Sequence, residues 1–256
     1  MRSKTDDFIQ NADSILDIAK KRGVVLRLLG ALAFRIRCPS FSQLYGALGR
    51  EISDIDFAGY SSQSKDIVTV FAEAGYIQDN EAMHEVALSG RMIFRPKPQP
   101  TPHIDVFLDK LEMCHTIDFR GRLELDYPTL NLADMLLEKM QIVMINEKDI
   151  QDTIVLLREH DVSKANDMNN IEVGHITNLL ANDWGFYYTV VSNLGKVAEA
   201  LKKYEALSNS DREIVAERIQ SILNFIEATP KSTKWKLRAK IGTKKKWYKD
   251  IEEVKR

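Results

Sequence analysis

Residues 50–60, with the sequence REISDIDFAGY, contain two carboxylates inside an otherwise apolar segment. Asp54 and Asp56 are two positions apart, with Ile55 between them and Phe57 after them. On a strand, side chains two positions apart point to the same face, so the aspartates would project together while Ile55 and Phe57 enter the core. Two like charges this close need compensation, and a divalent cation is the strongest local source of it.

A third carboxylate lies in residues 103–109, HIDVFLD, where apolar positions alternate strictly. His103, Asp105 and Phe107 would share one face of this strand. If the strand neighbours residues 54–59, Asp105 comes within roughly 5 Å of the aspartate pair. Three carboxylates could then bind Mg²⁺, as two ions about 3.5–4 Å apart. No second histidine stands at metal-ligand spacing, so His103 is better explained as a strand residue than as a ligand.

The paired aspartates also have a simpler interpretation. Acidic residues are common on edge strands, where they face solvent and oppose pairing with another chain. On that interpretation Asp54 and Asp56 would have no chemical role. The position of their strand in the sheet therefore separates the two hypotheses.

The surrounding elements form an α+β pattern. The spacing of apolar residues, together with glycine and proline positions, predicts helices over 5–22, 31–37 and 63–74 and strands over 24–29, 54–60, 84–89, 91–96 and 103–109. We expect loop over 38–51, a hairpin turn at Gly90, a stiff connection over 96–102 and a strand pair flanking Gly121. From Asn131 the apolar period becomes helical, and three or four more helices follow up to about Ala228.

We therefore predict a mixed sheet with flanking helices over residues 1–130, a helical domain over 131–228 and a basic tail over 229–256. Of the 256 residues, 44% are hydrophobic, enough for a sizeable core. Cys38 and Cys114 have no framework spacing, which favours a reducing cytoplasm over a disulfide scaffold. The first residues lack the apolar stretch of a signal peptide, and we expect no membrane segment.

The order of these parts resembles the nucleotidyltransferase superfamily that includes DNA polymerase beta and the aminoglycoside nucleotidyltransferases. The resemblance rests on a strand ending in LLGALA, a loop, an apolar-flanked D-x-D and a later strand with one aspartate. It implies that the turn at Gly30 and Ala31 opens a helix whose N–H groups bind a nucleoside triphosphate. It also implies that Asp54, Asp56 and Asp105 are catalytic and bind Mg²⁺. Ala31 stands where the family has a second glycine or a serine.

Residues 131–157 resemble a narrower group, the bacterial and archaeal nucleotidyltransferases related to toxin components of abortive-infection and toxin–antitoxin systems. Those proteins have a helical lysine followed by a K-D-x-x-D-like segment, matched here by Lys139 and by KDIQD at 148–152. The resemblance implies nucleotide-binding roles for Lys139 and Asp149, and for Arg50 and Ser53 before the D-x-D.

Both helical residues have simpler interpretations. Lys139 could be an exposed residue paired with Glu138 or Asp134. Asp149 could serve only as a negative charge at a helix N-terminus. Burial and ion-pair partners distinguish these interpretations from a place in the site.

The C-terminal tail is strongly basic. Residues 231–256 contain eleven Lys or Arg and three acids, while the whole chain has a net charge of −1. Trp235, Trp247 and Tyr248 are interleaved with the lysines, a mixture that binds RNA through phosphates and stacked bases. Alternatively, the aromatic residues anchor the tail to the domain as a hairpin turning near Gly242.

The resemblance implies transfer of a nucleoside monophosphate from a nucleoside triphosphate to RNA, protein or a small molecule, with release of pyrophosphate. A P-loop, a nucleophile elbow and an H-E-x-x-H motif are missing from the sequence, which disfavours kinases and hydrolases. Two other classes stay open: a nucleic-acid-binding module without catalysis, and a protein-binding component of a toxin–antitoxin pair.

Overall fold

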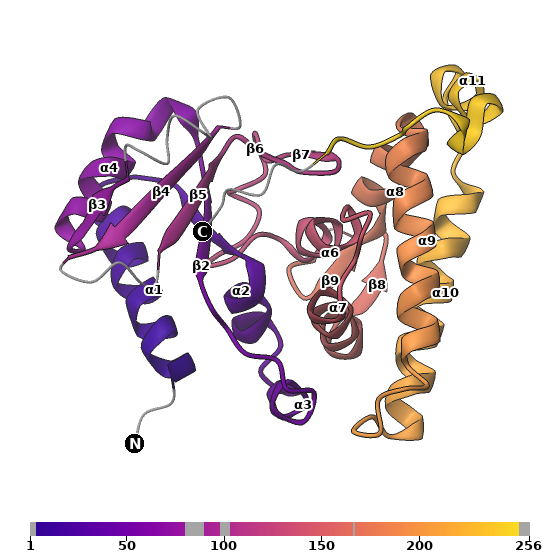
Figure 1. The fold of residues 1–256 in the computed structure, drawn as a ribbon, viewed down its shortest axis with the longest axis horizontal. Helices are drawn as coiled ribbons and strands as arrows, with labels where there is room; N and C mark the ends of the chain where they lie inside the picture. Colours follow the sequence, from indigo (N-terminus) through magenta and orange to yellow (C-terminus); the bar gives the residue numbers. More distant parts are fainter. Residues whose placement is uncertain (1–3, 80–89, 98–102, 166, 251–256) are drawn as a thin grey trace.

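The computed structural model describes residues 4–79, 90–97, 103–165 and 167–250. The protein is α+β, with a mixed sheet in the N-terminal half and mainly helices in the C-terminal half (Figure 1). One cluster of buried apolar residues extends from Phe8 to Ile226. The two halves therefore share a core, and the predicted boundary at 130/131 stays a prediction.

The sheet has five strands in the order β1-β2-β5-β4-β3. They are β1 (Leu26–Leu29), β2 (Ile55–Gly59), β3 (Tyr76–Gln78), β4 (Arg91–Pro96) and β5 (Ile104–Leu108). β2 and β5 are parallel, and the other neighbouring pairs are antiparallel. Because β2 has a strand on each side, the interpretation of Asp54 and Asp56 as edge-strand residues is wrong.

Helices α1 (Lys4–Lys21) and α4 (Ser64–Glu73) lie together beside the sheet (Figure 1). As predicted, Ile55 and Phe57 are fully buried. Phe71 of α4 stacks on Phe94 of β4 with ring centroids 4.1 Å apart and contacts Phe57 edge-on. This aromatic contact fixes the sheet against α4, and so fixes the strand that carries Asp56.

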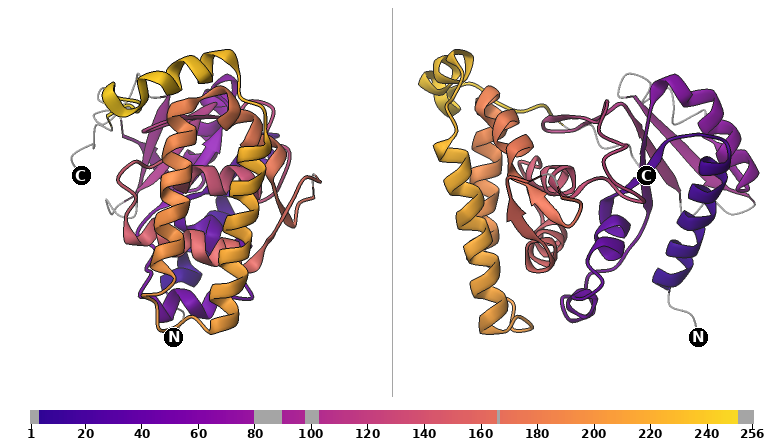
Figure 2. Two further views of the ribbon diagram at one scale, coloured as in Figure 1. Left: turned by 90° about the vertical axis from the view of Figure 1, so that its right-hand side faces the viewer. Right: turned by 180° about the vertical axis from the view of Figure 1, so that it is seen from behind.

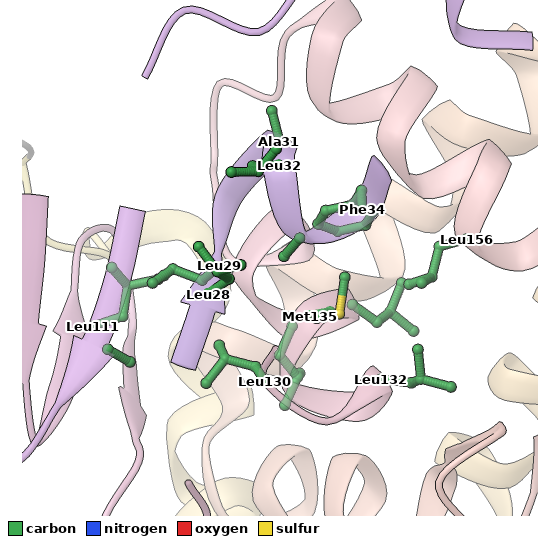
Figure 3. Packing of buried hydrophobic residues seen from close by; sticks show 14 of the residues in the cluster. Leu28, Leu29, Ala31, Leu32, Phe34, Leu111, Leu130, Leu132, Met135 and Leu156 are labelled. Atoms are coloured by element: carbon green, nitrogen blue, oxygen red, sulfur yellow. The ribbon is translucent and has the colours of Figure 1, made fainter. Parts of the chain in front are cut away.

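Helices α2 (Gly30–Arg37) and α3 (Ser42–Ala47) connect the sheet to the second half. That half contains α6 (Leu132–Met140), α7 (Glu147–Glu159), α8 (Val173–Asn182), α9 (Trp184–Ala200) and α10 (Asn209–Ala228). The helices predicted after residue 131 are therefore confirmed. Figure 2 shows α9 and α10 side by side, with the tail across one end. Figure 3 shows Leu28, Leu29, Leu32 and Phe34 packed among Leu130, Met135 and Leu156, so β1 and α2 share the core with α6 and α7.

Several local expectations are corrected by the structure. The predicted loop over 38–51 contains α3, which is held against α7 because Glu159 accepts hydrogen bonds from the Ser40 and Phe41 amides. Of the strand pair predicted around Gly121, the first strand, over 112–119, contains β7 (Thr116–Asp118), but the second strand, over 123–127, is wrong. β7 instead forms an antiparallel pair with β6 (Lys110–Glu112), which lies earlier in the chain. Residues 119–127 form successive turns instead of a strand.

A short parallel pair, β8 (Asp161–Ser163) and β9 (Asn170–Glu172), was not predicted, because three-residue strands leave little periodic signal. The predicted strand over 84–89 and most of the connection over 96–102 lie outside the described residues. No helix in the described part of the chain is long and apolar enough to cross a membrane.

The tail forms α11 (Thr233–Ile241) and a 3-10 turn at Gly242–Lys244, so the predicted hairpin is wrong. The anchoring role expected for its aromatic residues is confirmed. Trp235 contacts Tyr187 edge-on, and Trp247 contacts Tyr188 and donates a 3.1 Å hydrogen bond to Thr189 Oγ1. These contacts lie on α9, which leaves mainly lysines on the outer face of the tail.

Candidate functional site

Three neighbouring strands bring the predicted residues into one row. Leu29, the last residue of β1, is the register partner of Asp56 on β2, and Asp56 is the register partner of Asp105 on β5. Gly30 follows Leu29 directly, and Asp54 lies one residue before β2 begins. The predicted adjacency of the Asp56 and Asp105 strands is therefore confirmed. Asp54 and Asp56 are partly exposed, so a ligand could reach them.

Gly30 is required by the backbone and by its neighbour. Its φ of +69° lies in the left-handed region that favours glycine. A Cβ at this position would lie 2.4 Å from Asp56 Oδ2. Helix α2 begins at Gly30. Its N-cap residue, Leu29, makes no side-chain hydrogen bond to the start of the helix. Ala31 is buried in the first turn, 8% exposed, so its small side chain faces protein.

The environment of Asp56 disfavours its charge. Burial raises the pKa of its carboxyl well above the usual value, and the charges of Asp54, Asp105 and Glu138 raise it further. Lys139 acts in the opposite direction without offsetting them. A cation placed at Asp56 would relieve this repulsion.

Asp105 differs from Asp56 because two basic side chains lie beside it. Arg91 at the start of β4 forms an ion pair with its Oδ2, and His103 Nε2 lies 3.6 Å from the same oxygen. Burial alone would raise the pKa of Asp105, but hydrogen bonds from His103 and Arg91 outweigh burial and lower it. His103, one residue before β5, is therefore a hydrogen-bond partner of Asp105.

Lys139 is surrounded by acids and only 8% exposed. Its Nζ lies 3.2 Å from Asp152 Oδ2, 3.4 Å from Asp149 Oδ1 and 3.7 Å from Glu138 Oε1. Burial would lower the pKa of Lys139, but these three carboxylates outweigh it and raise the pKa. The interpretation of Lys139 as an exposed surface residue is wrong. Asp149 lies in the first turn of α7, but it also pairs with Lys139, so it is more than a helix charge.

Arg50 forms a buried, bidentate ion pair with Asp152. Its Nε and Nη2 donate to Asp152 Oδ1 and Oδ2 at 3.0 and 3.1 Å. This pair joins the segment before β2 to α7. In this structure the charges of Arg50 and Lys139 are both satisfied inside the protein, and their predicted contacts with a nucleotide stay predictions.

Ser53 is exposed, and its Oγ donates a 3.2 Å hydrogen bond to Asp54 Oδ1.

Sequence reasoning missed Glu138 as a member of the site, although it precedes Lys139. It also missed Arg91, whose only signal is an arginine at the start of a strand. Asp152 was noticed as part of a motif but was given no role.

The composition of the cluster suits a hard cation. Among the described side chains that interact around Asp56, six are carboxyls, namely Asp54, Asp56, Asp105, Glu138, Asp149 and Asp152, and four are basic, namely Arg50, Arg91, His103 and Lys139. Carboxylate oxygens are the ligands that Mg²⁺ prefers. Over the same described ranges, no group of three or more Asp, Glu, His or Cys side chains is placed so that it could hold a metal ion. The carboxylate oxygens present are of the kind that binds Mg²⁺. One of the predicted ligands, Asp105, is paired with Arg91 in this structure.

A scan against protein-family models gives no match, and a search of curated proteins gives none either. Among solved structures, the chain is similar to the solution structure of the antibiotic-resistance factor ANT(2″)-Ia. That similarity has a TM-score of 0.42 and 12% sequence identity, and it covers 69% of this chain and 95% of the other.

Proposed function

We propose that the protein is a Mg²⁺-dependent nucleotidyltransferase, which moves a nucleoside monophosphate from a nucleoside triphosphate to an acceptor and releases pyrophosphate. The observation that carries this proposal is the row formed by Asp56 and Asp105 at neighbouring positions of β2 and β5, with Gly30 directly after the end of β1 beside them. This row combines a helix start, which can bind phosphate, with carboxylates, which can bind a metal.

Each residue in the row has a distinct task in this proposal. The N–H groups at the start of α2 would bind phosphate oxygens, helped by the positive end of the helix dipole. Asp54 and Asp56 would hold Mg²⁺, which neutralises phosphate charge and orients the groups that react. Asp105 has a lowered pKa and so stays ionised, which suits a carboxylate that completes the metal site and orients the attacking hydroxyl.

The buried ion pairs act at a distance from the reacting atoms. Lys139 bridges Asp149 and Asp152 on α7, and Arg50 holds Asp152 from the segment before β2. Together they fix the strand that carries Asp56 against the helical half. In this proposal they position the site, while the charge of Lys139 also lowers the pKa of Asp56.

The test is pyrophosphate release and transfer of label from nucleoside triphosphates labelled on the α-phosphate, with total RNA, protein and small hydroxyl compounds as acceptors. Asp105→Asn keeps the shape of the side chain and should lower the rate about a hundredfold or more. Asp118→Asn, which changes an exposed aspartate paired with Arg120, is the matched control and should leave the rate unchanged. A rate that Asp105→Asn leaves intact would contradict the proposal.

The two non-catalytic alternatives give different results in the same experiment. A nucleic-acid-binding module would tolerate Asp105→Asn but lose binding when lysines 244–246 are removed. A component of a two-protein system would bind no nucleotide and would copurify with the product of a neighbouring gene.

A further inference from the structure

The first amide of α2 already has an acidic partner. The Gly30 N–H donates to Glu138 Oε1 at 3.1 Å and lies 3.4 Å from Oε2. Glu138 is 108 residues away in the sequence and lies on α6, so the contact is tertiary. The N-cap residue Leu29 offers no side-chain oxygen, and the Glu138 carboxylate takes that place.

A carboxylate in this position resembles a phosphate in its chemistry. Both are anions with oxygen acceptors, and both are stabilised by the N–H groups and dipole at a helix start. One N–H makes one strong hydrogen bond, so Glu138 and a phosphate group cannot both use the Gly30 amide fully. If both lay at the start of α2, their negative charges would also repel each other.

We propose that Glu138 occupies the phosphate-binding amide of Gly30 in the ligand-free protein, and that the triphosphate of the nucleotide displaces it. This inference depends on the proposed function and names a further residue of the same site. Glu138 thereby sets the affinity for the nucleotide, because phosphate must compete with a tethered carboxylate for the Gly30 amide.

Three features make this displacement feasible. Burial disfavours the charged form of Glu138 and raises its pKa to about 7, so the carboxylate is held at a cost. Lys139, 3.7 Å away, keeps Asp149 and Asp152 as partners when Glu138 moves. Displacement of Glu138 also favours the charged form of Asp56, because it removes one of the charges that raise the pKa of Asp56.

The test compares dissociation constants for Mg²⁺ with each nucleoside triphosphate, and with inorganic triphosphate, in wild type and two variants. Glu138→Gln keeps the size of the side chain and removes its charge, while Glu138→Asp keeps the charge and shortens the reach. Both should bind about tenfold more tightly or better, because the competing charged hydrogen bond is weakened or lost. Inorganic triphosphate should show the same gain, since the competition concerns phosphate and not the base.

The matched control is Glu159→Gln. Glu159 also accepts hydrogen bonds from backbone amides near a helix start, at Ser40 and Phe41, but it lies outside the row of strands. Glu159→Gln should leave the dissociation constants unchanged. Wild type that binds, with folded Glu138 variants that bind equally or more weakly, would overturn this inference and leave the proposed function standing. Absence of binding in wild type and both variants would overturn both.

Discussion

A Cβ on Gly30 would lie 2.4 Å from Asp56 Oδ2, so the turn between β1 and α2 and the central carboxylate fit together only when residue 30 is glycine. Gly30→Ala should displace Asp56 and abolish Mg²⁺-dependent nucleotide binding. It should also lower stability by about 1–2 kcal/mol, because a left-handed backbone is strained with a side chain. Calorimetric binding and urea unfolding measure the two effects.

Gly23→Ala is a matched control for this prediction. Gly23 has the same φ of +69°, but a Cβ there would meet nothing within 4 Å. The control should lose similar stability and keep nucleotide binding. If both variants lose binding equally, the contact with Asp56 is not the cause.

The buried pair between Arg50 and Asp152 should matter mainly for stability. Arg50→Ala leaves Asp152 without its bidentate partner and should lower the free energy of unfolding by about 3–5 kcal/mol. Arg50→Lys cannot donate two parallel hydrogen bonds, so its free energy of unfolding should lie between those of Arg50→Ala and wild type. Arg22→Ala breaks an exposed pair with Glu73 and should cause no measurable change in urea unfolding. An Arg50→Ala protein as stable as wild type would contradict this account of the pair.

Glu138 should give the stability a pH dependence. Its pKa is about 7 in the folded protein and near the usual 4.5 in the unfolded chain. Between these values the folded state binds more protons, so the free energy of unfolding falls as pH rises from about 4.5 to 7. Glu138→Gln cannot titrate, so its stability relative to wild type should rise over this window by roughly 2–4 kcal/mol. A difference that stays constant in urea unfolding at pH 5 and pH 7.5 would contradict the prediction.

If the acceptor is RNA, we expect the tail to contact it by charge alone, because Trp235 and Trp247 pack against α9. Lys244, Lys245 and Lys246 are exposed. Replacing all three with alanine should weaken RNA binding and reduce its dependence on salt, with stability and nucleotide binding unchanged. RNA binding that is equal in the variant and wild type, over a salt series, would exclude this surface.

Much of the site could be predicted because its signals are local. The alternation around Asp54 and Asp56 and around Asp105 fixed which residues share a strand face, and the positive φ of Gly30 matched the glycine turn. The partners of these residues could not be predicted. Glu138 reaches Gly30 across 108 residues, and this contact depends on how α6 packs against α2.

The errors in the fold have a similar cause. Helix α3 has only six residues and depends on Glu159 and Gln151 of α7, which bond backbone groups on either side of it. The residues after Gly121 carry an alternating pattern typical of a strand, yet they form turns beside β1, where Leu28 pairs with residues 128–130. In both places tertiary contacts override the local pattern.

The most direct test of the central claim is calorimetric binding of each nucleoside triphosphate with and without Mg²⁺. It compares wild type with the double variant Asp54→Ala and Asp56→Ala. The matched control, Asp13→Ala with Asp17→Ala, removes two exposed aspartates from α1. The account predicts Mg²⁺-dependent binding in wild type and in the control, and its loss in the Asp54 and Asp56 variant. Binding that survives the loss of both aspartates, or no binding of any nucleotide to wild type, would contradict it.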